Sequence, residues 1–270
     1  MSTLAGDLER EASSLAGRVG FAVSNLKTGE SVFRLQDDRF PTASTVKLPV
    51  LTAFHAFVDE GHARWDDMAL IDAGDLAPGS GILQHLDLPR EISYRDAAWL
   101  MICLSDNTAT NILLRALTID GANRLIARII GGGIQLDKFA GYRAGEPVHS
   151  MGQATPRALG RYLNDLAADR LPGAAATKSV AAEQVYRNTI PRYLPYDPYR
   201  PGALSIANKT GGMPGICADI AVVTQAGTTV TMAFMADSTD GRSDVGEKES
   251  QQCIGRMSKI VYETWLAGVA

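Results

Sequence analysis

The sequence predicts an α/β fold of the α+β type: a five-stranded antiparallel sheet flanked by helices, with an all-helical part inserted between its strands. Residues 1–38 have a helix pattern and two strand patterns, residues 39–200 are mostly helical, and residues 201–270 return to strands before a closing helix. With 270 residues and 46% apolar content, the chain can bury a substantial core. We therefore expect a single domain over residues 1–270, with an α/β part (1–38 and 201–270) and a helical part (39–200).

The N-terminal segment predicts one helix and one β-hairpin. Apolar residues at helical spacing indicate the helix: Leu4, Leu8, Ala12 and Leu15. The hydrophobic period then changes to that of strands over Arg18 to Ser24 and Ser31 to Leu35. Asn25 to Glu30 is a short connection that contains glycine, which is typical of a hairpin loop.

The middle of the chain predicts a series of helices. Tyr94 to Leu104 and Thr108 to Leu117 have helical patterns, and Thr155-Pro156 is a typical helix start. Phe139 to Gln153 contains glycine, proline and few periodic apolar residues, so we expect an irregular loop there.

Three further strand patterns lie near the C-terminus, at Ala203 to Asn208, Cys217 to Thr224 and Thr229 to Ala236. Because their connections are short, we expect them to be antiparallel, and the N-terminal hairpin would complete a five-stranded sheet by covering an edge. One apolar stripe predicts the closing helix: Ile254, Met257, Ile260, Val261 and Trp265.

Charge and composition argue against several classes of partner. The net charge is −4 and no basic run is present, so we expect no nucleic acid partner. No apolar stretch is long enough to cross a bilayer, and the first residues lack a signal-peptide pattern. We expect a cytoplasmic protein without a membrane partner, or a periplasmic or secreted one if a leader was removed. Cys103, Cys217 and Cys253 have neither disulfide nor zinc-ligand spacing, and no metal or organic cofactor is expected.

Ser44 and Lys47, within FPTASTVKLPV, are the first candidate catalytic pair. Three residues apart at a helix start, they would share one helical face. We expect Thr42 to be the N-cap, which places Ser44 in the first turn, where free backbone N–H groups and the helix dipole favour negative charge. Pro49 is expected to kink this helix.

Two further motifs strengthen the assignment, Ser105-Asp106-Asn107 and Lys209-Thr210-Gly211. The tripeptide Lys27-Thr28-Gly29 has the same letters as the second, but it precedes the serine and lies in the predicted hairpin turn, so we expect no role for it. With Ser44 and Lys47, the motifs in this order resemble those of class A β-lactamases and penicillin-binding proteins. The resemblance runs from about Gly20 to Val223 and implies the serine β-lactamase and DD-peptidase fold.

The resemblance also implies catalytic roles. Ser44 is the nucleophile and Lys47 its base, which requires burial and the charge of Lys209 to lower the pKa of Lys47. Lys209 and Thr210, followed by Gly211, would bind a substrate carboxylate, and Ser105 would relay a proton to the leaving nitrogen. Asn107 would bind the substrate amide or Lys47. The backbone N–H groups of Ser44 and Gly212 would stabilise the tetrahedral intermediate.

Deacylation is where the sequence departs from this family. The family's water-positioning glutamate lies in an E-x-x-L-N pattern, whereas the corresponding loop here has Glu146 followed by proline, with His149 and Ser150 nearby. We assign Glu146 as the catalytic carboxylate of this step and keep His149 as an alternative. The arginine that binds the substrate carboxylate in many family members, on the strand after K-T-G, is also absent. Cys217 occupies the corresponding stretch, and Arg242, in the next loop, is the candidate substitute.

These residues predict a serine acyl-enzyme hydrolase acting on a β-lactam-like cyclic amide. The expected partner is a small-molecule substrate, an amide or ester that carries a carboxylate. Two alternatives share the same scaffold. One is an intracellular esterase, amidase or acyltransferase, and the other is a penicillin-binding sensor that acylates without turnover. The sequence leaves the oligomeric state open.

Overall fold

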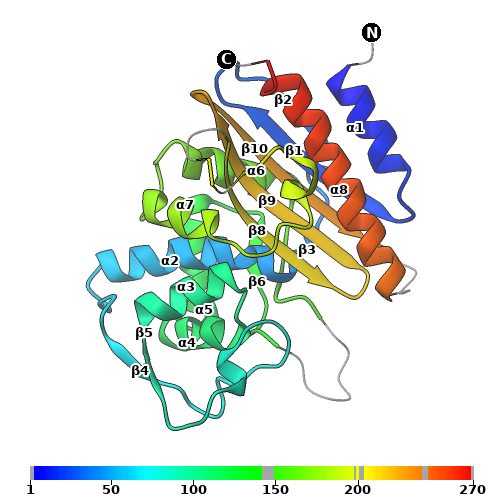
Figure 1. Cartoon of the computed structure of the whole chain (residues 1–270). Helices are drawn as coiled ribbons and strands as arrows, with labels where there is room; N and C mark the ends of the chain where they lie inside the picture. Colours follow the sequence, from blue (N-terminus) through cyan, green and yellow to red (C-terminus); the bar gives the residue numbers. More distant parts are fainter. Residues whose placement is uncertain (1–2, 142–148, 198, 201–203, 239–242, 269–270) are drawn as a thin grey trace.

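The computed structural model describes residues 3–141, 149–197, 199–200, 204–238 and 243–268 (Figure 1). Its α-helices are α1 (Leu4–Ser13), α2 (Lys47–Asp59), α3 (Tyr94–Cys103), α4 (Asn107–Leu117), α5 (Ile119–Ile130), α6 (Pro156–Ala167), α7 (Ala174–Ala182) and α8 (Ser243–Trp265). Its 3-10 helices are η1 (Ala43–Val46), η2 (Leu83–His85) and η3 (Ile190–Tyr193). Its strands are β1 (Arg18–Asn25), β2 (Ser31–Arg34), β3 (Phe40–Pro41), β4 (Met68–Leu70), β5 (Glu91–Ser93), β6 (Ile134–Leu136), β7 (Gly152–Ala154), β8 (Ser205–Met213), β9 (Ile216–Gln225) and β10 (Thr228–Asp237).

The central element is a five-stranded sheet in the order β2-β1-β10-β9-β8. All four neighbouring pairs are antiparallel, which confirms the predicted sheet. The N-terminal hairpin completes it because β1 pairs with β10, with Phe21 opposite Phe234. The first and last parts of the chain therefore build one sheet, as their strand patterns predicted.

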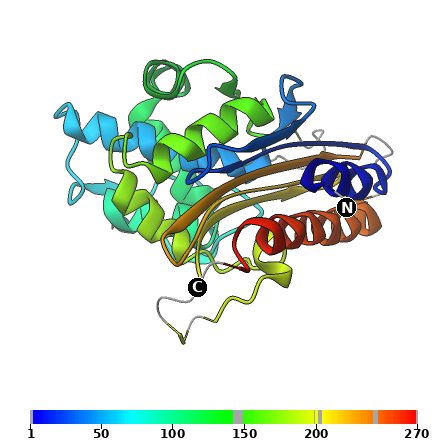
Figure 2. The ribbon, with the colours of Figure 1, turned by 90° about the horizontal axis from the view of Figure 1, so that it is seen from above.

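The two faces of this sheet pack against different helices. Figure 2 shows α1 and α8 together on one face and the helical region on the other. Along β9, Ala221 and Val223 point to the α1 and α8 side, whereas Ile220 and Val222 point to the helical side. This alternation is the period of a strand that is buried on both faces. The predicted stripe of the closing helix is confirmed, since α8 buries its apolar residues on the sheet.

Helix α2 is the centre of the helical part. It packs against α3, α4, α5 and α7, and its N-terminal end meets β8 through η1. Helix α6 belongs to the same sequence region but lies on the sheet, against β1 and β10. Two small sheets, β3-β7-β6 and β4-β5, were not predicted, because strands of two or three residues are too short to show an alternating pattern.

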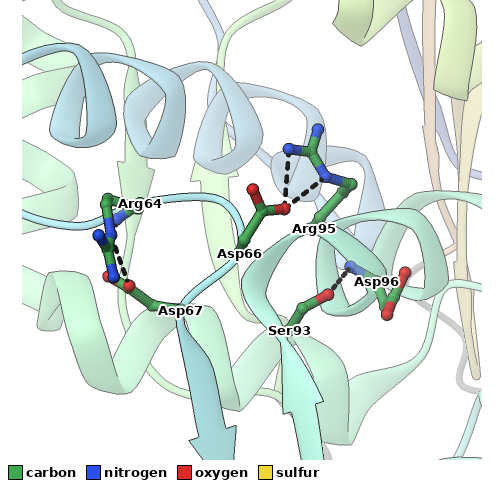
Figure 3. A network of polar contacts seen from close by, with 6 residues as sticks. All are labelled: Arg64, Asp66, Asp67, Ser93, Arg95 and Asp96. Carbon is green, nitrogen blue, oxygen red and sulfur yellow. Dashed lines mark hydrogen bonds and ion pairs between the residues drawn. The ribbon is translucent and has the colours of Figure 1, made fainter.

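Ion pairs lie at one end of the β4-β5 hairpin, next to the start of α3 (Figure 3). Arg95, on α3, binds Asp66 at 3.0 Å, and Arg64 binds Asp67 at the same distance. Exposed ion pairs of this kind contribute about 0–1 kcal/mol each. They add little to the stability of the hairpin.

A serine cap defines where α3 begins. Ser93 is the N-cap, and its Oγ accepts a hydrogen bond from the N–H of Asp96 at 3.0 Å (Figure 3). Such a cap contributes about 1 kcal/mol, because it satisfies a backbone donor that the helix leaves without a partner.

Within the described ranges, no helix combines the length and apolar character that a membrane span requires. The cysteines Cys103, Cys217 and Cys253 form no disulfide with one another, as their spacing predicted.

Candidate active site

Ser44 lies in a 3-10 turn that leads into α2. Helix η1 covers Ala43–Val46, and the α-helix begins at Lys47. Pro49 is therefore in the first turn of α2, where backbone N–H groups have no partner within the helix, and the predicted kink is unnecessary. Thr42 is the N-cap residue of this turn, as expected, but its side chain makes no capping hydrogen bond. Contacts other than a side-chain cap must therefore hold this turn.

Lys47 lies one turn beyond Ser44, fully buried. Its Nζ donates hydrogen bonds to the carbonyl oxygen of Ser105 at 2.7 Å, to Asn107 Oδ1 at 2.8 Å and to Ser105 Oγ at 3.3 Å. Burial lowers the pKa of Lys47 well below its ordinary value, and the charge of Lys209 lowers it further, while Asp106 opposes the shift. Burial and Lys209 are the two causes that the sequence suggested.

Ser105 and Asp106 form the junction between α3 and α4, as predicted. Ser105 has a left-handed backbone, with φ of 54°, which turns its carbonyl oxygen toward Lys47. Asp106 is the N-cap of α4, and its Oδ2 also accepts from the backbone N–H groups of Ile82 and Leu83 at 2.7 and 3.0 Å. The aspartate thus holds the loop that faces Ser44 across the cleft.

Asn107 bridges the same loop and the buried amine. Its Nδ2 donates to the Pro78 carbonyl at 2.8 Å while its Oδ1 accepts from Lys47. Its own N–H donates to the carbonyl of Ser80. These contacts fix the orientation of the amide side chain.

Lys209-Thr210-Gly211 lies inside strand β8. The predicted end of this strand at Asn208 is wrong, because pairing with β9 continues to Met213 opposite Ile216. Gly211 permits a close approach to η1: a Cβ there would lie 2.6 Å from the Thr42 carbonyl oxygen and 2.9 Å from the Ser44 nitrogen. Glycine is needed because the strand backbone packs directly on the serine turn.

Lys209 is fully buried, with Nζ donating to the Thr210 carbonyl oxygen at 2.9 Å. Burial lowers the pKa of Lys209 to about 7, against the opposing charge of Asp219. Asp219 is a buried acid on β9 whose oxygens accept from Asn208 Nδ2 at 3.1 Å and from the N–H of Ile190 at 3.0 Å. Burial raises the pKa of Asp219 to about 6.

Sequence reasoning missed Asp219. The signal was present, because Asp219 is the one acid within the apolar strand segment ICADIAVV. A charged residue in a strand buried on both faces requires polar partners, and such residues are candidates for a site.

Two cavities meet at Ser44. One, of about 380 Å³, is lined by Ser44, Asn107, His149 and Gly212 among others. The other, of about 200 Å³, is lined by Ser44, Ser105, Thr210, Gly211 and Gly212 among others. The structure thus brings together Ser44, Lys47, Ser105, Asn107 and Lys209-Thr210-Gly211-Gly212. Glu146 and Arg242 lie outside the described residues.

In the described part of the chain, no group of three or more His, Cys, Asp or Glu side chains is arranged to hold a metal ion.

The chain belongs to the β-lactamase enzyme family, because the sequence model of that family matches residues 3–265. It has the serine hydrolase scaffold of that family. A β-lactamase of Streptomyces lavendulae is 28% identical over 167 residues, 59% of this chain and 53% of that protein. The β-lactamase CARB-3 of Pseudomonas aeruginosa is 27% identical over 161 residues, 57% of this chain and 54% of that protein. The aligned part thus spans about half the length of these curated relatives.

Solved structures share the fold over nearly the whole chain. A β-lactamase from Sphaerobacter thermophilus has a TM-score of 0.85 at 27% identity, covering 97% of this chain and 96% of that one. PBP-A has a TM-score of 0.81 at 24% identity, covering 97% and 95%, and a single-residue mutant of PBP-A was solved as an acyl-enzyme complex with penicillin G. The likeness to PBP-A shows the fold alone.

Proposed function

We propose that this protein is a serine acyl-enzyme hydrolase that resembles class A β-lactamases and opens a β-lactam-like cyclic amide. One observation carries the proposal: Ser44 lies where two cavities meet, and one turn further along the chain the buried amine of Lys47 is held by Ser105 and Asn107. The lowered pKa of Lys47 favours its neutral form more than in an ordinary lysine, and a neutral amine is the base that the hydroxyl of a serine nucleophile requires.

In the proposed acylation step, Ser44 Oγ attacks the carbonyl carbon and its proton passes to Lys47 Nζ. The tetrahedral intermediate then breaks its C–N bond, and the leaving nitrogen receives a proton through Ser105. The products are an ester on Ser44 and an amine that stays joined to it when the amide was cyclic. The backbone N–H groups of Ser44 and Gly212 would stabilise the oxyanion, a contribution of about 3–4 kcal/mol per donor in other hydrolases.

Lys209 and Thr210 would bind an anionic group of the substrate. A lysine with a pKa of about 7 is partly charged near neutral pH, and a substrate carboxylate in the cleft would raise that charged fraction. Thr210 lines the smaller cavity and offers a hydroxyl beside it. We therefore expect substrates that carry a carboxylate near the scissile amide.

Deacylation requires water to attack the ester carbonyl, which releases a carboxylic acid and restores the serine hydroxyl. We assign the positioning of this water to Glu146. Glu146→Gln is expected to leave acylation nearly unchanged and to trap the acyl-enzyme, because the amide keeps the side chain's size but takes up no proton. Pre-steady-state kinetics would show a burst without turnover. Unchanged steady-state turnover would remove Glu146 from the mechanism.

The test of the proposed function is mass spectrometry of the protein mixed with a β-lactam and followed over time. A transient adduct with hydrolysed product is the result expected of a hydrolase. A persistent adduct would instead indicate a penicillin-binding sensor, and no adduct would favour an esterase, amidase or acyltransferase.

Ser44→Ala is the matched control for this experiment. It is expected to abolish the adduct and all labelling by a fluorophosphonate probe, while circular dichroism and the unfolding transition stay those of the wild type. Labelling that survives the substitution would contradict the assignment of Ser44 as the nucleophile.

A further inference from the structure

Ser150 lies where the segment that precedes α6 meets the segment that carries Ser44. Its Oγ accepts a hydrogen bond from the backbone N–H of Ala43 at 2.9 Å and donates one to the carbonyl oxygen of Gly152 at 2.8 Å. Ser150 is half-buried and lines the larger cavity. One hydroxyl thus joins two parts of the chain that are 107 positions apart, immediately before the candidate nucleophile.

This contact continues the small sheet of β3 and β7 beyond its last backbone pair. Strand β3 ends at Pro41, which lies opposite Gln153. The N–H of Thr42 still donates to the Gly152 carbonyl oxygen at 3.0 Å. The N–H of Ala43 donates to the Ser150 hydroxyl, where a longer strand pair would have offered a backbone carbonyl. Ser150 therefore satisfies a backbone donor that the strand itself leaves without an acceptor.

Ala43 has a backbone conformation that needs support. Its φ is 43°, in the left-handed region, which is sterically unfavourable for a residue with a Cβ. Such a conformation persists only where the surrounding contacts impose it. Ala43 is the first residue of η1 and Ser44 the second, so the direction of Ser44 follows from the backbone of Ala43.

We propose that Ser150 is a positioning residue for Ser44: its hydroxyl holds Ala43 in the left-handed conformation that directs the nucleophile to the junction of the two cavities. Gly211 packs on the same turn from strand β8, so the serine is fixed between a strand and a side-chain hydrogen bond. The inference rests on the proposed role of Ser44 and assigns no chemical step to Ser150.

The test measures labelling of Ser44 by a fluorophosphonate over a range of probe concentrations. In this reaction the bond from Oγ to phosphorus forms, fluoride leaves and the serine proton passes to the base. Ser150→Ala is expected to lower the maximal labelling rate about tenfold or more, because small displacements of a nucleophile have large kinetic effects. The half-saturating probe concentration should change less than about twofold.

A matched control is Ser31→Ala. Ser31 also donates a hydrogen bond through its Oγ, to Ser24 at 2.9 Å, but it lies on β2 at the far edge of the main sheet. Its removal should leave labelling within about twofold of the wild type.

A second variant separates positioning from folding. Glycine adopts a left-handed backbone without a steric cost, so Ala43→Gly combined with Ser150→Ala should label at least about threefold faster than Ser150→Ala alone. A double variant as slow as Ser150→Ala would overturn the inference. A maximal labelling rate of Ser150→Ala within about twofold of the wild type would also overturn it. A change in the half-saturating probe concentration alone would overturn it as well, since that result would make Ser150 a substrate contact. Wild-type protein that is not labelled at Ser44 would instead refute the proposed function.

Discussion

The tripeptide lysine-threonine-glycine occurs twice in this chain, at residues 27–29 and at residues 209–211, in very different surroundings. The first copy lies in the turn between β1 and β2, and all three residues are exposed. The second lies within β8, where Lys209 is fully buried and Thr210 and Gly211 line a cavity that reaches Ser44.

Local hydrogen bonds account for the first copy. Asn25 Oδ1 accepts from the N–H groups of Lys27 and Thr28 at 3.0 and 3.2 Å, and Gly29 has a φ of 78° with open space around it. These are the features of a turn closed by asparagine and glycine. In this copy, the three residues form the turn between the two strands.

Long-range contacts account for the second copy. Gly211 is in contact with η1, and the ammonium of Lys209 is influenced by Asp219 from the neighbouring strand. The chemical environment of this tripeptide therefore comes from its tertiary surroundings, because the same three side chains are exposed to solvent in the turn.

The strongest test of this difference substitutes the two lysines. Lys209→Ala is expected to lower kcat/KM for carboxylate-bearing substrates about a hundredfold or more, because it removes a buried cation from the site. Lys27→Ala should change kcat/KM less than about twofold, as for an exposed residue outside the site. Steady-state kinetics on both variants measures the difference. Equal losses of kcat/KM in the two variants would show that the burial of Lys209 does not distinguish the roles of the two copies.

Substitution of the two glycines isolates the packing of the backbone. Gly211→Ala should slow acylation about tenfold and destabilise the fold by about 1–3 kcal/mol, because its Cβ would collide with the turn of Ser44. Gly29→Ala should destabilise the fold by about 1–2 kcal/mol, because a Cβ there has open space but the backbone is left-handed. It should leave the acylation rate unchanged. Denaturant unfolding and acylation rates measure the two effects. A normal acylation rate in Gly211→Ala would contradict the argument from close approach.

The smallest effect is expected from the buried carboxylate beside Lys209. Asp219 raises the pKa of Lys209 against the effect of burial, so Asp219→Asn should lower that pKa. Lys209 would then lose its proton at a lower pH, and the alkaline limb of kcat/KM for a carboxylate-bearing substrate should move to lower pH. The pH profiles of the two proteins measure this shift. A limb that stays in place or moves to higher pH would exclude Asp219 from control of Lys209.

The same pKa values give the sign of the pH dependence of folding. Since the pKa of Lys209 is about 7 in the folded protein and 10.5 ordinarily, the unfolded chain binds more protons between these values, and stability contributed by this group rises with pH across that window. Asp219, with its pKa raised to about 6 from 3.8, has the opposite effect: its contribution falls as the pH rises from 3.8 to 6.

The sequence alone determined the features that depend on local pattern. Hydrophobic periodicity predicted the hairpin of β1 and β2, the last three strands and the stripe of α8, and turn chemistry distinguished the tripeptide at Lys27 from the one at Lys209. The order of the motifs predicted which residues would meet at Ser44. These signals are readable because strands, helices and turns impose a period or a backbone conformation on neighbouring residues.

Contacts between distant elements fix how those residues are held. They extend β8 through Gly211 by pairing it with β9, bury Lys209 near Asp219, and place the hydroxyl of Ser150 on the amide of Ala43. Each of these contacts joins residues from separate elements, and neither periodicity nor spacing records which distant group will complete a hydrogen bond or exclude water from a charge. The sequence therefore specified the chemical groups of the site, whereas long-range packing set their pKa values and the backbone conformation that positions Ser44.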